Sequence, residues 1–158
     1  MRIALFQPDI AANAGTIIRL GACMGVPIDI IEPCGFPFGD AALRRAGLDY
    51  VPKAQVTRHA SWNAFRATQP ARLVLASTRG STPYTDFGFE DGDTLLLGQE
   101  SSGVPADVAN ACDGRIFIPM VEGMRSLNVA VAAGMILGEM LRQTRTNGRA
   151  KGEMRNEH

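Results

Sequence analysis

Cysteine and histidine are scarce in this chain of 158 residues. The three cysteines, Cys23, Cys34 and Cys112, are far apart, odd in number and without C-x-x-C spacing, which argues against a disulfide framework and a zinc site. The two histidines, His59 and His158, leave few candidates for a metal site or for a Cys/His nucleophilic pair. We therefore expect a mechanism without a metal.

Long apolar runs and the common nucleotide-binding signatures are missing as well. The longest apolar stretch, residues 129–141, is interrupted by Gly134, Gly138 and Glu139 and is shorter than the roughly 20 residues that span a bilayer. No G-x-G-x-x-G, P-loop or G-x-S-x-G pattern occurs, so the main signals for a dinucleotide fold, a P-loop NTPase and a nucleophile elbow are absent. Because no signal-peptide pattern follows Met1, we expect a cytoplasmic protein without a membrane segment.

The chain also has no excess of charge, since 16 basic residues balance 16 acidic ones. Global charge therefore does not indicate a nucleic-acid binder. All basic residues except Lys53 and Lys151 are arginines, whose planar guanidinium suits bidentate contacts to phosphate. Arginines are frequent in the middle of the chain, Arg44 and Arg45 among them, and again near its end. The alternative is a solvated surface, which we favour for residues 143–158, expected to be a flexible tail.

Short apolar runs closed by proline, glycine or polar turns predict buried strands at residues 3–6, 28–31, 73–76, 94–97 and 116–118. The segments between them favour helices at residues 16–24, 41–46, 60–68, 105–111 and 127–142. Strands that alternate with helices predict an α/β fold with a mostly parallel sheet flanked by helices. We expect one domain over residues 1–158.

The last expected helix is apolar around most of its circumference. A helix of this kind needs cover on most sides, and in a small domain a second subunit is a natural cover. Gly134 and Gly138 are one turn apart and would allow another backbone to approach closely. We therefore expect a homodimer that contacts through residues 127–142, with packing inside one domain as the alternative.

Polar residues gather in three places along the chain. In the first, residues 13–25, a helix beginning near Gly15 would place Thr16, Arg19 and Cys23 on one face, with Arg19 able to reach an anion at the start of the helix. An ion pair between Arg19 and a carboxylate such as Glu32 is an equally good reading of the local sequence.

The second place is residues 95–105, where a strand leads into Gly98, Glu100 and Gly103. Glycines at both ends of a short loop allow a backbone to approach a ligand closely. The third place is the start of the last helix, with Arg125, Ser126 and Asn128. Open α/β sheets bind ligands beyond the carboxyl ends of their strands, so this arrangement favours a polar organic ligand. Taken alone, Ser126 could simply cap the helix.

Together, the patterns N-x-G-x-x-x-R at Asn13, G-x-E-x-x-G at Gly98, and I-P-M followed by R-S-L-N at Ile118 resemble the three motifs of the SPOUT methyltransferase superfamily. The strings "IIEP", "LRRAGLDY" and "TRH", which begin at Ile30, Leu43 and Thr57, are similar to the short tRNA 2′-O-methyltransferases of the TrmL (YibK) type. The resemblance covers nearly the whole chain. Departures are mild: Thr16, Val104 and Ala130 stand where relatives often have Asn, Leu and Ser.

The resemblance implies a SPOUT fold with a C-terminal trefoil knot that binds S-adenosyl-L-methionine. It assigns cofactor binding to Ala76, Thr78, Gly98, Gly103, Ile118, Met120, Ser126 and Leu127. It assigns catalysis to Arg19, Asn13, Glu100 and Asn128, and RNA binding to Arg19, Arg44, Arg45 and Arg125.

The activity that the resemblance implies is 2′-O-methylation of the ribose at the wobble nucleotide, position 34, of tRNA. The expected substrates are leucine isoacceptors, contacted through the anticodon stem-loop. Three alternatives stay open: a ribose methyltransferase for another tRNA or rRNA position, a non-catalytic RNA-binding protein, and a small-molecule α/β enzyme. The free guanidinium of Arg19, with its pKa above 12, is a poor base, so an electrostatic role for Arg19 is physically attractive.

Overall fold

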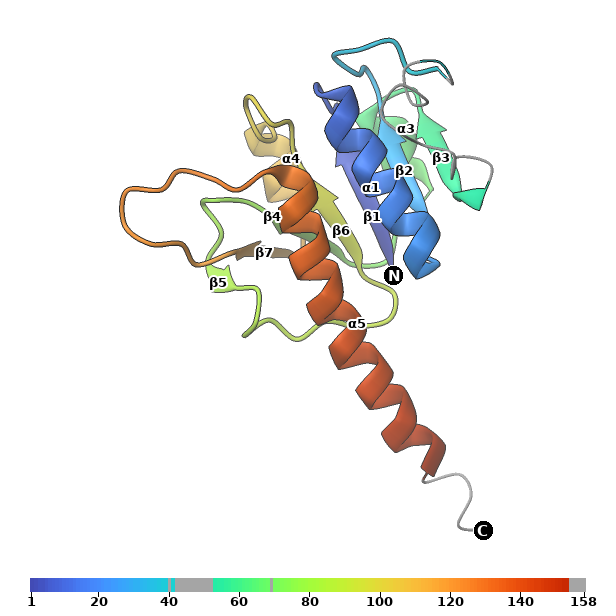
Figure 1. Cartoon of the computed structure of the whole chain (residues 1–158), viewed down its shortest axis with the longest axis vertical. Coiled ribbons are helices and arrows are strands. Elements are labelled where there is room, and N and C mark those ends of the chain that lie inside the picture. The colour runs from blue at the N-terminus through green and yellow to red at the C-terminus, as the bar shows by residue number, and fades with distance from the viewer. Residues whose placement is uncertain (40, 42–52, 69, 154–158) are drawn as a thin grey trace.

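A computed structural model describes residues 1–39, 41, 53–68 and 70–153 of the chain. In these residues, parallel strands form one seven-stranded sheet in the order β3-β2-β1-β6-β4-β7-β5 (Figure 1). The strands are β1 (Arg2–Phe6), β2 (Ile28–Ile31), β3 (Val56–His59), β4 (Leu73–Ala76), β5 (Thr82–Pro83), β6 (Thr94–Leu97) and β7 (Gly114–Phe117). The expected parallel α/β fold is confirmed.

The apolar runs form the middle of the sheet. Strands β2 and β6 are buried along their whole length, and β1 and β4 are buried at all but one position each. Such strands lie between two layers of helices, so their sequences are continuously apolar rather than alternating. This is why the sequence predicted them well.

The two edge strands, β3 and β5, are not predicted from the sequence. Thr57 and Arg58 in β3 are exposed, so this strand has no apolar run. Strand β5 contains only Thr82 and Pro83, and proline is tolerated at a sheet edge because it has no N–H to donate. Edge strands with polar residues therefore escape a search for apolar runs.

In the part of the chain that the structure describes, two helices cover each face of the sheet. Helices α1 (Ala11–Met24) and α5 (Val129–Glu153) lie side by side on one face (Figure 1). Helices α3 (Trp62–Ala67) and α4 (Ala106–Asn110) bury Phe65 and Val108 on the other face. These helices confirm the expectations for residues 60–68 and 105–111, whereas the helix expected at residues 41–46 lies outside the described residues, apart from Ala41.

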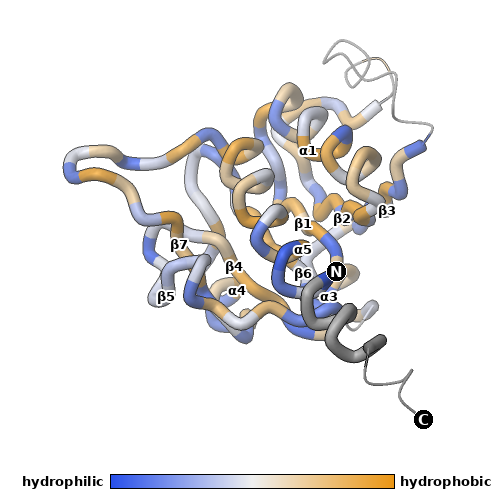
Figure 2. The backbone as a smooth tube through the Cα atoms, turned by 60° about the horizontal axis from the view of Figure 1, so that its bottom comes forward, coloured by the Kyte–Doolittle hydropathy of each residue, from blue (hydrophilic) through white to orange (hydrophobic). Residues whose placement is uncertain are grey.

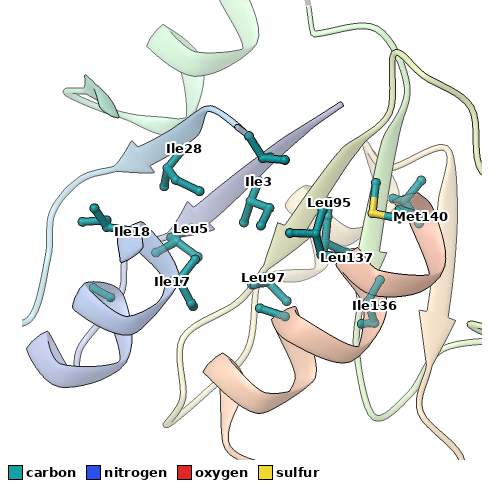
Figure 3. Packing of buried hydrophobic residues seen from close by; sticks show 14 of the residues in the cluster. Ile3, Leu5, Ile17, Ile18, Ile28, Leu95, Leu97, Ile136, Leu137 and Met140 are labelled. Carbon is teal, nitrogen blue, oxygen red and sulfur yellow. The ribbon is translucent and has the colours of Figure 1, made fainter. Parts of the chain in front are cut away.

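The larger core lies between the sheet and the pair α1 and α5. Figure 3 shows Ile17 and Ile18 of α1 and Ile136, Leu137 and Met140 of α5 pointing toward the sheet. On the sheet they meet Ile3, Leu5, Ile28, Leu95 and Leu97. All of these side chains are at most 2% exposed, so this layer fixes the positions of both helices on the sheet.

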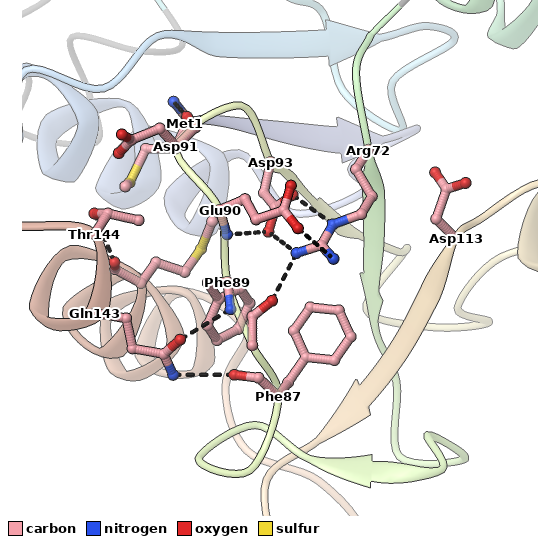
Figure 4. Close-up of polar contacts among 12 residues, drawn as sticks. Met1, Arg72, Phe87, Phe89, Glu90, Asp91, Asp93, Asp113, Gln143 and Thr144 are labelled. Carbon is pink, nitrogen blue, oxygen red and sulfur yellow. Dashed lines mark hydrogen bonds and ion pairs between the residues drawn. The ribbon is translucent and has the colours of Figure 1, made fainter. Parts of the chain in front are cut away.

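Helix α5 begins two residues later than expected and runs past Arg142 to Glu153, so the segment expected as a tail starts as helix. Gln143 ties it to the loop before β6: its side chain donates to the Phe87 carbonyl at 3.0 Å and accepts from the Phe89 N–H at 2.9 Å (Figure 4). Arg72, directly before β4, donates to both carboxylate oxygens of buried Asp93 at the end of that loop at 2.7 Å. The Gln143 contacts therefore join α5 to the loop, and the Arg72–Asp93 contacts join the loop to the start of β4.

Two expectations concern the chain as a whole. Within the described residues, no helix is both long and apolar enough to cross a membrane. The C-terminal trefoil knot stays a prediction.

Candidate functional site

The carboxyl ends of β1, β6, β4 and β7 lie next to one another, because these strands are consecutive in a parallel sheet. The chain segments that follow them are residues 7–10, 98–105, 77–81 and 118–128. All three motifs predicted from the sequence lie in these segments or in the helices that follow them. This edge of the sheet is the candidate site.

A chain of hydrogen bonds joins one residue from each motif. The Asn13 side-chain amide of α1 donates to Glu100 Oε1 at 3.3 Å. The Asn128 amide, from the segment before α5, donates to Asn13 Oδ1 at 2.9 Å. The structure therefore brings together Asn13, Glu100 and Asn128, which the sequence grouped as a catalytic set.

Asn128 also caps helix α5. Its Oδ1 accepts from the backbone N–H of Ala130 at 2.9 Å and of Val131 at 3.3 Å, the donors that an N-cap side chain satisfies. The reading of Ser126 as the helix cap is therefore wrong. One side chain both starts α5 and links it to α1.

Asp9 belongs to the same cluster, although the sequence analysis did not single it out. Its carboxylate accepts from the Glu100 N–H at 3.1 Å and from the Ser101 hydroxyl. In return, the Asp9 N–H donates to Glu100 Oε2 at 3.2 Å. The available signal was an acidic residue three positions after the end of β1, at the same sheet edge as Glu100.

The two carboxyl groups differ in acidity. Contacts with Glu100 and Ser101 lower the pKa of Asp9 to about 2. Burial, and then the contact with Asp9, raise the pKa of Glu100 above its usual range. Asp9 is thus the firmly ionised member of the pair, and the Glu100 carboxylate is the stronger base.

The loop after β6 is closed by its own backbone. Gln99 and Gly103 exchange two N–H to carbonyl hydrogen bonds, each 2.9 Å long. A Cβ on Gly98 would lie 2.6 Å from the Gly103 carbonyl carbon, so Gly98 is required by the loop itself. Gly103 has φ +69° and open space where a Cβ would stand, so a ligand could approach its backbone.

The segment after β4 lies against β7. The Ser77 N–H donates to the Ile116 carbonyl at 2.9 Å, and a Cβ on Gly80 would lie 2.4 Å from the same carbonyl group. Sequence reasoning missed Gly80. Of the residues expected at the cofactor, Ala76, Ile118 and Met120 are half-buried and Thr78 is exposed, all at this sheet edge.

Ser126, Leu127 and Arg125 lie in residues 121–128, which are exposed throughout. Figures 1 and 2 show this segment as part of a long loop that extends away from the sheet before it returns to α5. These three residues are therefore close to the site in the sequence, but the structure does not enclose them in it.

Arg19 lies on the exposed face of α1 together with Thr16 and Cys23, which confirms the expected shared face. The helix begins at Ala11 rather than near Gly15, so Arg19 stands more than two turns inside it rather than one turn inside. Glu32, the carboxylate considered as its partner, forms an ion pair with Arg58.

Arg44, Arg45 and the string that begins at Leu43 lie outside the described residues. Among the residues that the structure does describe, no group of three or more His, Cys, Asp or Glu side chains could hold a metal ion.

Fold and site together define an α/β protein whose polar groups converge at the carboxyl ends of parallel strands, where such folds bind organic ligands. The profile of the SpoU rRNA Methylase family matches residues 1–138, and the chain belongs to this family.

Three comparisons with individual proteins agree with the family. The chain is 55% identical over 147 residues to a tRNA (cytidine(34)-2′-O)-methyltransferase from Ancylobacter novellus, a match that covers 91% of this chain and 93% of the relative. It resembles a solved structure described as giving insights into 2-OH methylation of C/U34 on tRNA, with a TM-score of 0.85, 40% identity, and coverage of 90% and 94%. It also resembles an AdoMet-bound rRNA methyltransferase from Sinorhizobium meliloti, with a TM-score of 0.80, 29% identity, and coverage of 89% and 55%.

Proposed function

We propose that this chain transfers a methyl group from S-adenosylmethionine to the ribose 2′-hydroxyl of nucleotide 34 in tRNA. The observation that carries the assignment is the 55% identity, over more than nine-tenths of both chains, to a relative named for this reaction. The chain of hydrogen bonds Asn128–Asn13–Glu100 supports it, because it gathers the three motifs at one sheet edge.

In this reaction the ribose oxygen forms a bond to the methyl carbon, the sulfur–carbon bond breaks with its electron pair going to sulfur, and the hydroxyl proton leaves. The sulfonium methyl is already an activated electrophile, so much of the rate comes from alignment. Asn13 and Asn128 are amides that can orient a hydroxyl by hydrogen bonding. Glu100 has lone pairs beyond its two contacts and a raised pKa, so it can hold the leaving proton.

The residues at the sheet edge fit S-adenosylmethionine. Gly103 exposes backbone to open space, while half-buried Ala76 and Ile118 offer apolar surface to the adenine. Gly98 keeps the loop closed. We assign cofactor contacts to these residues and to Thr78, Met120, Ser126 and Leu127.

We assign RNA phosphate contacts to Arg19 and Arg125, with Arg44 and Arg45. Arg19 and Arg125 are exposed, so both can meet a large polyanion. An Arg19 guanidinium next to the reacting ribose stabilises negative charge on the oxygen without acting as the base.

We also propose that the working form is a homodimer that contacts through α5. Val131 and Met135 of α5 are one helical turn apart and are 52% and 39% exposed, so they form a short apolar stripe that the core of the domain leaves uncovered. The positions of Gly134 and Gly138 have open space where a Cβ would stand. A second α5 covers this stripe, and two copies pool their arginines on one tRNA.

The decisive experiment incubates the purified chain with S-adenosylmethionine and unmodified tRNA, then locates the methyl group by nucleoside mass spectrometry of ribonuclease fragments. We expect 2′-O-methylation at position 34 and none on an anticodon stem-loop with a 2′-deoxynucleotide there. Leucine isoacceptors are the expected substrates, and the minimal stem-loop tests whether that part of tRNA suffices. Methylation at another position or of rRNA contradicts the assignment, and a chain that fails to bind S-adenosylmethionine in calorimetry is a non-catalytic RNA-binding protein.

A further inference from the structure

Asp9 holds the loop after β6 by three hydrogen bonds in two directions. Its carboxylate accepts from the Glu100 N–H at 3.1 Å and from the Ser101 hydroxyl, and its own N–H donates to Glu100 Oε2 at 3.2 Å. The loop is therefore fixed through both its backbone and the side chain of Glu100. These contacts join segments 91 positions apart in the sequence.

Asp9 is itself held in place from two sides. Directly after β1, Gln7 has φ 44°, a left-handed conformation that is unusual for a residue with a side chain and that turns the chain at the end of the strand. On the other side, Gly35 donates its N–H to the Pro8 carbonyl at 2.9 Å, and a Cβ on Gly35 would lie 2.8 Å from Asp9 Cα. The Asp9 backbone therefore has little freedom to move.

We propose that Asp9 is a positioning residue for the methyl-transfer site: by clamping the Glu100 loop, it fixes where the Glu100 carboxylate meets Asn13. The proposal rests on the proposed function. Glu100 Oε1 is bound by Asn13 and Oε2 by the Asp9 N–H, so the carboxylate is held between helix α1 and the end of β1. Without the Asp9 side chain, the Glu100 N–H and the Ser101 hydroxyl lose their acceptor. Only the bonds to the Glu100 carboxylate, from the backbone N–H of residue 9 and from Asn13, then still tie the loop to the rest of the site.

The test compares three variants with the wild type. Asp9→Ala removes the two side-chain bonds of the clamp and keeps the backbone one, while Asp9→Asn keeps the size and the oxygen that accepts from Glu100 but replaces the oxygen that accepts from Ser101. Asp86→Asn, in an exposed loop, is the matched control. Because a displacement of about 1 Å can cost about 100-fold in rate, we expect Asp9→Ala to lower kcat about 100-fold. We expect Asp9→Asn to lower it less, with KM for tRNA and the affinity for S-adenosylmethionine close to wild type in both variants.

A purely structural role predicts something else: unchanged kcat per folded molecule, with a lower melting temperature or loss of cofactor affinity. For Asp9→Asn, an unchanged kcat per folded molecule or a loss of affinity for S-adenosylmethionine overturns the proposal. This variant serves as the test if Asp9→Ala does not fold.

Hydrogen exchange gives a readout that does not depend on activity. The Glu100 amide donates to Asp9, so peptides covering residues 98–104 should exchange faster in Asp9→Ala than in the wild type or in Asp86→Asn. Unchanged exchange overturns the clamp. If wild type does not methylate position 34, the proposed function fails, and this measurement still decides whether Asp9 positions Glu100.

Discussion

Asn128 and Asn13 are 115 positions apart, yet the side-chain amide of Asn128 donates to Oδ1 of the Asn13 side chain at 2.9 Å. Asn128 at the same time caps α5 through its own oxygen. One residue therefore couples the start of the last helix to the first helix and, through Asn13, to Glu100. A change in the cap and a change in the site can be separated, because they use different atoms of the same side chain.

Asn128→Asp should keep the cap and break the link. Aspartate caps helices as well as asparagine does, so the free energy of unfolding should stay within about 0.5 kcal/mol of wild type. The substituted carboxylate has no N–H for Asn13, so methyl transfer should fall at least about tenfold, the size of one lost hydrogen bond in a transition state. Denaturant unfolding and single-turnover kinetics measure the two effects.

Asn128→Ala is the matched variant, since it removes both functions. It should lose about 1 kcal/mol of stability in addition to the activity. Full activity of Asn128→Asp would show that the contact between the two amides is incidental.

The sequence predicted where the site lies, but it did not predict all of the contacts that hold the site together. Asn13, Glu100 and Asn128 could be grouped because their motifs resemble a known family, and they meet in space because β1 and β6 are parallel neighbours whose carboxyl ends share an edge. Asp9 could not be identified in this way, because its importance depends on a backbone N–H that only the folded loop presents.

Packing was the least predictable property. The sequence suggested that Gly98 leaves space for a ligand, whereas the structure fills that space with the Gly103 backbone. Ile136, which has the same apolar character as Val131, is fully buried against the sheet of its own domain, while Val131 is 52% exposed. Composition shows that α5 is apolar on many sides, but only the fold shows which side the sheet has already covered.

Gly98→Val should therefore damage the loop before it affects any ligand. A Cβ at position 98 would lie 2.6 Å from the Gly103 carbonyl carbon, so the two Gln99–Gly103 hydrogen bonds cannot keep their geometry. We expect a lower melting temperature together with lost binding of S-adenosylmethionine. Gly88→Val is the control, because a Cβ at Gly88 meets open space. A variant at Gly98 with wild-type stability that still fails to bind cofactor would favour the simpler idea of a blocked pocket.

Arg19→Ala should abolish methyl transfer and leave the affinity for S-adenosylmethionine nearly unchanged. Arg19 lies on the exposed face of α1, whereas the residues assigned to the cofactor follow β4, β6 and β7. Calorimetric titration with the cofactor and methylation of tRNA separate the two effects. Arg145→Ala, also an exposed arginine on a helix, should retain most activity. Parallel loss of cofactor binding and activity in Arg19→Ala would contradict the assignment of Arg19 to RNA.

Val131→Glu should separate the proposed dimer into monomers without unfolding them. Val131 belongs to the exposed stripe on α5 together with Met135, so a carboxylate there is solvated in the monomer and buried unpaired in the dimer. The cost to association should be on the order of 3 kcal/mol, about 100-fold in the dissociation constant. Sedimentation equilibrium measures this constant, and circular dichroism checks that the monomer is folded.

Two further variants make the dimer test specific. Ile136→Glu should unfold the protein rather than dissociate it, because Ile136 is 0% exposed in the core of its own subunit. Val121→Glu, at an apolar residue that is 76% exposed in the loop before α5, should leave association unchanged, since it lies outside the stripe. If tRNA needs arginines from both copies, Val131→Glu should also lose methyl transfer while it still binds S-adenosylmethionine. A wild type that is monomeric and fully active at micromolar concentration would disprove the dimer, because the stripe would then be exposed in the working enzyme.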